Sequence, residues 1–515
     1  MPHLHHSSHP LSSKLPSGVK MSTCSSLSGF PPELLLKTFG YLCDHCHDER
    51  DKPIYSQTTF KGKASLLNLS LASKQMSAMA TPILHHNLPS LDVNKACQLL
   101  SNLLSKPHLA ENIYKARLDA TIWYAQRTLG QQRVINTLLE RLELDPWDPY
   151  SSKGRDGSGS DGSNMEDDEG MDDEDDDEEG DEKANDDEAP MLDEMARAED
   201  EEAIAKFYCA VVRELVTRAR NLQELEITNT MEEETEDGAD RWSPDEYEDA
   251  AWQRLIADPA ALANLRRLEI IHWDTEGGFS LNDTEPTLAS LVLAAANNLE
   301  RLSVQLCEGI SLDRTFPSLT AVELWSSCFT SENLETLIVS LPALREFRYD
   351  SGGATVTDEE DEHTPADVVR LLGLRSATLT SVVLCYAGSF VQDMDQTLLD
   401  SFSAFPVLES MDLWAGDVFD KSIFPPPTNR LVSILPKSLK RLNIAGSCPA
   451  QECQSLATAA AAGQFPALEE VTFERVLGRP AEGQPSYPKI KTDEDFWTPI
   501  RDAFRSLKIK CSVEE

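Results

Sequence analysis

The second half of the chain repeats one short pattern, in which an apolar residue stands at positions one, four and six. Positions four and six of an extended strand point to the same side, so each occurrence predicts a short strand with one buried face. Helix-like stretches separate the occurrences, for example at 285–297, 331–341, 365–374 and 451–462. The nine occurrences begin at Leu222, Leu265, Leu299, Leu319, Leu344, Leu379, Leu408, Leu439 and Leu468.

A series of this kind predicts a solenoid. The starts are separated by about 31 residues on average, and single steps range from 20 to 43. Because no repeat can bury its apolar side alone, neighbouring repeats are expected to stack their strands into a parallel sheet covered by helices. Ile113, Ala116 and Leu118 fit the pattern loosely as a further first strand, and a helix at 493–504 with a strand ending near Cys511 would cap the far end. The alternative is an ordinary α/β domain with unrelated strands.

The N-terminal region carries a different pattern. Residues 30–42 begin Phe-Pro-Pro and place Leu35, Phe39 and Leu42 on one face of a predicted helix. A second apolar run at 64–76 follows a polar break at 43–61. Both runs are apolar on more than one face, which a unit of this size cannot bury by itself. These helices therefore either pack on the rest of the chain or bind a partner.

The run Phe-Pro-Pro-Glu-Leu-Leu-Leu-Lys, followed by Leu-Leu-x-Leu-Ser-Leu-x-Ser-Lys, resembles an F-box over residues 27–88. The resemblance implies a three-helix module that binds a Skp-type adaptor and, through it, a cullin in an SCF ubiquitin ligase complex. The adaptor-binding residues that it implies are Pro31, Pro32, Leu34, Leu35, Phe39, Leu42, Leu67, Leu69, Ser73 and Lys74. The connection at 43–61 is longer than F-boxes usually have, which could weaken adaptor docking. The alternative is a cap packed on the following domain.

The repeats from Leu222 to Val513 resemble the irregular leucine-rich repeats that follow an F-box. The implied fold class is α/β: a three-helix F-box, then a leucine-rich-repeat solenoid with a parallel sheet on the concave side and helices outside, and a disordered acidic insert. We expect a disordered leader at 1–26, the F-box at 27–88, and a helical connector or first degenerate repeat at 89–150. The acidic insert at 151–202 and the capped solenoid at 203–515 follow. The asparagine that usually ends the strand in this family is absent, so other groups must hydrogen-bond the turns.

Positions five and seven of each strand are expected to face the concave side. Trp325 and Trp414 stand there, with Tyr386 nearby, and large aromatic side chains on such a face are common anchors for a partner. We expect them to form an aromatic patch inside an acidic rim that binds a basic or amphipathic target segment; alternatively, both tryptophans pack under a loop. The target-binding residues expected on this face are Glu269, Glu323, Trp325, Arg348, Tyr386, Asp412 and Trp414.

The charge balance makes some classes of binding partner more plausible than others. The formal net charge is −42, and residues 151–202 hold 25 Asp and Glu against 4 Lys and Arg. Such a chain has no excess of cations to replace phosphate counterions, so direct nucleic-acid binding is not expected. The acidic tract is either a solvated spacer or a polyanion that attracts basic proteins such as histones. No apolar run is long enough to span a membrane, and eleven unpaired-looking cysteines indicate a reduced protein of the cytoplasm or nucleus.

No catalytic chemistry is predicted. The chain lacks a phosphate loop, a Rossmann glycine fingerprint, a nucleophile elbow and HExxH. Residues 43–47 read Cys-Asp-His-Cys-His, but no second cysteine pair lies close in sequence, so neither a metal nor a cofactor is expected. The predicted function is a non-catalytic substrate receptor of a ubiquitin ligase that marks its target for degradation. The alternative is an acidic leucine-rich-repeat scaffold or histone chaperone, independent of ubiquitin transfer.

Overall fold

The structure is a computed structural model, and it divides into two compact units, residues 1–87 and 88–515. It describes residues 31–43, 46, 59–119, 129–142, 207–228, 262–272, 279–282, 288–311, 314–352, 364–388, 398–419, 429–477 and 494–513. The predicted leader at 1–26, the acidic insert at 151–202 and most of the 43–61 connection lie outside the described residues.

The first unit contains three helices: α1 (Pro32–Gly40), α2 (Thr59–Ala72) and α3 (Lys74–Leu84). Pro32 occupies the first turn of α1, where its missing N–H costs nothing, and the Ser73 hydroxyl accepts a hydrogen bond from the Met76 N–H to cap α3. Helix α3 contacts both other helices. The core between them consists of Leu35, Phe39, Cys43, Leu66, Met76, Ala80 and Ile83.

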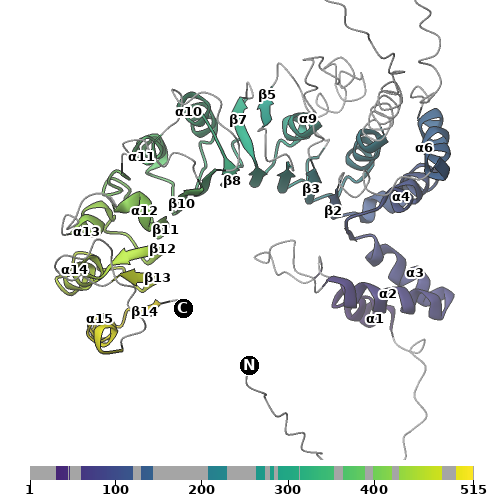
Figure 1. Cartoon of the computed structure of the whole chain (residues 1–515). Helices are drawn as coiled ribbons and strands as arrows, with labels where there is room; N and C mark the ends of the chain where they lie inside the picture. Colours follow the sequence, from purple (N-terminus) through teal and green to yellow (C-terminus); the bar gives the residue numbers. More distant parts are fainter. Residues whose placement is uncertain are drawn as a thin grey trace, which may run out of the picture. The chain divides into compact units, whose positions relative to one another are not determined.

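The second unit is built on a parallel sheet of twelve strands in the order β1-β2-β3-β4-β6-β8-β9-β10-β11-β12-β13-β14, whose strands line the inner side of a curved array with helices outside (Figure 1). The strands are β1 (Asn87–Leu88), β2 (Lys115–Leu118), β3 (Glu224–Thr228), β4 (Arg267–Ile271), β6 (Arg301–Gln305), β8 (Ala321–Ser327), β9 (Glu346–Gly352), β10 (Ser381–Gly388), β11 (Ser410–Trp414), β12 (Arg441–Pro449), β13 (Glu470–Leu477) and β14 (Lys510–Val513).

Helices lie between many of these strands along the chain. They are α4 (Val93–Ser105), η3 (Pro107–Asn112), α6 (Leu129–Arg141), a helical segment at 207–218, α9 (Leu288–Ala295), α10 (Ser331–Ser340), α11 (Pro365–Leu372), η7 (Gly373–Arg375), α12 (Ala415–Val418), α13 (Arg430–Ile434), α14 (Ala450–Ala461) and α15 (Glu494–Ser506). A separate two-stranded parallel sheet joins β5 (Phe279–Asn282) to β7 (Cys307–Ser311), and the repeat pattern did not predict it. No helix among the described residues is long and apolar enough to cross a membrane.

The nine predicted strands are confirmed, and they stack in a constant register. Position four of one repeat lies opposite position four of the next, as in the series Leu225, Leu268, Leu302, Val322 and Phe347. These side chains are buried in one continuous core under the helices. The coarse prediction of an α/β solenoid with a parallel sheet therefore holds, and β2 and β14 extend that sheet at its two ends.

The backbone repeats as regularly as the side chains do. In each repeat the carbonyl at position two accepts hydrogen bonds from the N–H groups at positions two and three of the following repeat. The Gln223 carbonyl, for example, accepts from Arg266 and Arg267, and the Thr320 carbonyl from Arg345 and Glu346. This ladder fixes the register independently of the core, because a slip by one residue would break every one of these hydrogen bonds.

Several different side chains satisfy the backbone groups at the strand ends. The buried Tyr208 hydroxyl donates to the Leu118 or Thr228 carbonyl (3.0 and 3.2 Å) and accepts from the Thr228 N–H (3.1 Å). Tyr349 repeats this arrangement further along, where its hydroxyl donates to the Ser327 carbonyl (2.8 Å) and accepts from the Phe329 N–H (3.3 Å). A buried backbone amide needs such a partner, and the two tyrosine hydroxyls supply it at these strand ends.

Candidate functional site

The first unit exposes large apolar side chains that its own core does not cover. They are Leu34 (53% exposed), Leu36 (44%), Tyr41 (63%), Leu67 (53%) and Leu71 (78%), and we call them the unit 1 apolar surface. Leu67 and Leu71 lie one turn apart on α2 and therefore share one face of that helix. Single exposed apolar residues are common, but five in one small unit are typical of an interaction surface.

The structure divides the predicted adaptor-binding residues into two groups. Pro31, Pro32, Leu34, Leu67, Ser73 and Lys74 are exposed. Leu35 and Phe39 instead belong to the core, with 3% and 2% exposure, and Leu42 and Leu69 pack partly against it. Leu35 and Phe39 therefore hold the helices together and are not exposed for contact with another protein, whereas Leu42 and Leu69 remain partly exposed.

Two members of the unit 1 apolar surface lie on α2 and three lie on or next to α1. Leu36, Tyr41 and Leu71 were not among the residues carried over from the family motif. The four-residue spacing from Leu67 to Leu71 could have identified Leu71, because it predicts a shared helix face. Tyr41 follows the last turn of α1, where the sequence offers no comparable signal.

In the second unit, the inner face of the sheet carries half-buried side chains from β8 to β13. The Arg348 guanidinium lies over the Trp325 ring, with Cζ 3.5 Å from the ring centroid. Both residues come from adjacent strands of the sheet, and this cation–π contact holds them in place. One face of Trp325 is therefore already occupied by a cation from the same chain.

Tyr386 and Trp414 do not join Trp325 in one patch. The Tyr386 ring packs against the core residue Tyr349, with ring centroids 5.7 Å apart, and burial raises the pKa of its hydroxyl well above the usual value. Trp414 lies against Gly446, where an added Cβ would stand 3.2 Å from the ring. Trp325 and Trp414 lie three strands apart, which corresponds to about 14 Å. The inner face therefore has separate aromatic positions.

Polar groups lie between and beside these aromatic side chains. The half-buried Asp350 on β9 stands opposite Cys385 on β10, and burial raises the pKa of its carboxyl. Asp412 accepts a hydrogen bond from the Asn443 amide (2.9 Å), and Glu323 forms an ion pair with Arg301 (3.2 Å). From β8 to β13, positions five and seven carry four carboxylates (Glu323, Asp350, Asp412 and Glu474) against the single cation Arg348.

Glu269 is not accessible to a target, contrary to our expectation. It is 8% exposed on β4 and pairs with Arg267 (3.6 Å). The strand pattern predicts which side of the sheet a residue faces, and it does not predict whether that side is covered. At β3 and β4 the side chains at positions five and seven are buried as well, so the accessible inner face begins further along the sheet.

Glu226, opposite Glu269 on β3, is the most perturbed carboxyl of this buried region. It is 2% exposed and forms an ion pair with Arg117 (2.7 Å). Burial, followed by the neighbouring Glu269 and Asp119, raises its pKa to about 7 despite the opposing effect of Arg117. The sequence placed Glu226 on the inner face but gave no signal of its burial.

The chain has little similarity to known proteins. No protein-family model matches it, and no curated protein does either. A crystal structure of a protein from Bacteroides fragilis is similar with a TM-score of 0.31 and 11% sequence identity. The match covers 57% of this chain and 66% of that one, slightly under two thirds of its length. Inference about function therefore depends on the two surfaces described above.

Proposed function

We propose that the chain is a non-catalytic substrate receptor of a cullin-type ubiquitin ligase. Its first unit, read as an F-box, binds a Skp-type adaptor through the unit 1 apolar surface. Its second unit, read as a leucine-rich-repeat solenoid, binds a target protein on the inner face between β8 and β13. The observation that carries the proposal is the exposure of five large apolar side chains on or next to α1 and α2.

The exposed leucines are large enough to support binding. Full burial of a leucine side chain contributes about 1.5–3 kcal/mol, and Leu67 and Leu71 expose 53% and 78% of their surface. Covering the pair with a partner is therefore worth about 2–4 kcal/mol. Since each 1.4 kcal/mol changes a dissociation constant tenfold, truncating both leucines should weaken binding by about 30-fold or more.

The inner face of the second unit supports a basic target segment. Its excess of carboxylates favours Lys and Arg on the partner, and like charges on an acidic partner would be repelled. Trp414 and the Trp325–Arg348 pair supply rigid contact area on this face. Transfer of ubiquitin then depends on proximity: the receptor holds the target beside the ligase and raises its effective concentration.

The proposal is tested by measuring the affinity of the purified full chain for a purified Skp-type adaptor by calorimetry. The informative variants are Leu67→Ala and Leu71→Ala, alone and together. Matched controls are Val339→Ala and Leu374→Ala, because these residues are also about half exposed (53% and 51%) but belong to the second unit. Leu66→Ala, next to Leu67 but 2% exposed, reports the effect of damaging the core.

Each outcome decides the proposal. We expect the Leu67 and Leu71 variants to weaken adaptor binding without a change in melting temperature, the controls to bind as wild type, and Leu66→Ala to lower the melting temperature. A wild-type chain that fails to bind the adaptor, or a double variant that binds as tightly as wild type, contradicts it. Salt-sensitive binding of histones by a chain that ignores the adaptor would favour the acidic scaffold instead.

A further inference from the structure

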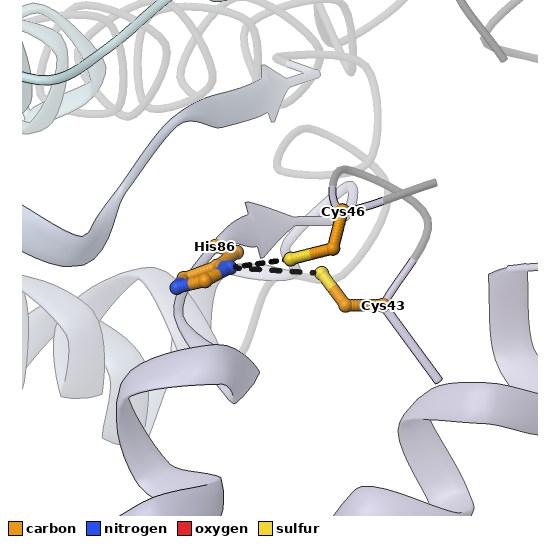
Figure 2. A group of neighbouring side chains, drawn as sticks. All are labelled: Cys43, Cys46 and His86. Carbon is orange, nitrogen blue, oxygen red and sulfur yellow. Dashed lines mark hydrogen bonds between the residues drawn. The ribbon is translucent and has the colours of Figure 1, made fainter. Parts of the chain in front are cut away.

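Three potential metal ligands converge in the first unit from positions forty residues apart. The ligand atoms of Cys43, Cys46 and His86 all lie within 4.8 Å of one another. His86 Nδ1 lies 3.3 Å from the Cys46 sulfur and 3.8 Å from the Cys43 sulfur. Figure 2 shows both sulfurs directed at the same edge of the imidazole ring. The sequence showed only the run Cys-Asp-His-Cys-His at 43–47 and led us to expect no metal, because His86 is too distant along the chain to be counted with it.

The fold brings the three residues together at the ends of two helices. Cys43 follows α1, and the Cys46 N–H donates to the Cys43 carbonyl (3.1 Å), which holds the two cysteines close together. His86 follows α3, where its N–H donates to the Ile83 carbonyl (3.1 Å). The backbone around the site is closely packed, because a Cβ added at Gly62 of α2 would collide with the Leu42 carbonyl oxygen.

The separations match those of tetrahedral zinc ligands. With Zn–S of about 2.3 Å and Zn–N of about 2.0–2.1 Å, a tetrahedral angle puts a sulfur and a nitrogen about 3.6 Å apart. The two measured sulfur–nitrogen distances, 3.3 and 3.8 Å, lie on either side of this value. Two thiolates and one imidazole are also a ligand set that selects zinc over magnesium or calcium, which prefer oxygen.

We propose that Cys43, Cys46 and His86 bind one Zn²⁺ ion that joins the end of α1 to the end of α3. On binding, the two thiols release their protons to solvent, and the metal gains two bonds to sulfur and one to the imidazole nitrogen. The zinc undergoes no change of oxidation state. Its fourth position is left for a water molecule or another donor.

The two cysteines differ in exposure, and this difference allows a zinc ion to reach the site. Cys43 is 5% exposed and belongs to the core of the unit, whereas Cys46 is exposed. An ion can therefore reach the exposed sulfur from solution while the buried one anchors it to the core. The bound metal would stabilise the folded state by an amount that rises with the logarithm of the zinc concentration above the dissociation constant, because the unfolded chain does not hold the three ligands together.

The test uses the full chain, purified under reducing conditions, reconstituted with Zn²⁺ and dialysed against a weak chelator. Zinc content is measured by mass spectrometry, and Co²⁺ substitution reports the ligands, because thiolate–cobalt charge-transfer absorption cannot come from carboxylates or from the leader histidines. The variants are Cys46→Ser and His86→Gln. The matched controls are His85→Gln, whose ring nitrogen is 2.7 Å from the Thr81 carbonyl, and the half-buried Cys328→Ser.

We expect one zinc per chain and a thiolate–cobalt band for wild type and both controls, and loss of both signals in the two site variants. Because Cys46 is exposed, Cys46→Ser should leave the fold intact, which is checked by circular dichroism. A chelator should lower the melting temperature of wild type and not that of Cys46→Ser. Zinc retained by Cys46→Ser and His86→Gln, no zinc in wild type, or a Cys43–Cys46 disulfide in the reduced preparation would overturn the proposal.

Discussion

Replacing Glu226 by glutamine tests whether the side chains on the inner face of β3 and β4 are shielded from water. Glu226 is 2% exposed, and its pKa rises from 4.5 to about 7 because burial disfavours the charged form. The folded protein therefore holds this proton more tightly than the unfolded chain does. The carboxyl favours the folded state most below about pH 4.5, and this contribution is lost as the pH rises to about 7.

The size of this pH-dependent change in stability follows from the folded and unfolded pKa values of Glu226. A difference of 2.5 between 4.5 and about 7 corresponds to about 3 kcal/mol at 1.36 kcal/mol for each unit. Glutamine cannot ionise, so Glu226→Gln lacks this pH-dependent loss. We expect the free energy of unfolding of the variant to rise relative to wild type by about 3 kcal/mol between pH 4.5 and pH 7.5. The ion pair with Arg117 needs the ionised carboxylate, so its effect is already contained in the pKa of about 7 and is not added separately.

The assay is urea unfolding of both proteins at half-unit pH intervals, followed by circular dichroism and by tryptophan fluorescence, whose agreement checks for a single transition. Ser303→Ala is the control, because Ser303 is a buried side chain two strands away on the same face and cannot titrate over this range. Its difference from wild type should stay constant with pH. A Glu226→Gln difference that changes by less than about 0.5 kcal/mol would show that Glu226 ionises as an ordinary solvated carboxyl.

Two further predictions concern the tyrosines at the strand ends and the glycine beside Trp414. Tyr208→Phe should lower the free energy of unfolding by about 1–3 kcal/mol, because it leaves buried backbone groups without their hydrogen-bond partner. Tyr349→Phe should lower it by a similar amount if the two hydroxyls have the same role. Urea unfolding measures both changes. Gly446→Ala should lower the free energy of unfolding more than Gly463→Ala does. Both glycines have positive φ (+79° and +78°), but only at Gly446 would the new Cβ press on Trp414. Equal losses of stability in the two variants would contradict this contact.

The apolar periodicity predicted most of the second unit. Leu225, Leu268 and their equivalents are buried in register because a solenoid leaves no other way to cover them. The small β5–β7 sheet escaped prediction because β5 and β7 lie between successive occurrences of the repeat pattern. Contacts between side chains of neighbouring strands, such as Arg348 on Trp325, depend on register and rotamer, and a pattern along one strand contains neither.

In the first unit, the apolar character of the helices could be predicted from the sequence, but the orientation of their side chains could not. The sequence showed that its helices are apolar on several faces, but not which leucines face the core. Leu66 and Leu67 are adjacent in sequence, and one is buried while the other is half exposed, because the position of α3 decides between them. His86 could not be linked to Cys43 and Cys46 before the ends of α1 and α3 were known to meet.

The two proposals for the first unit support each other physically. A small unit folds by burying most of its apolar surface, and below about 70–80 residues a single core contributes only a few kcal/mol. Among its described residues, this unit buries seven apolar side chains in its core and leaves five large ones exposed. Surface kept for a partner cannot also stabilise the fold, so another source of stability is needed when the partner is absent. A metal that joins the ends of α1 and α3 would supply it without covering any of the five exposed side chains.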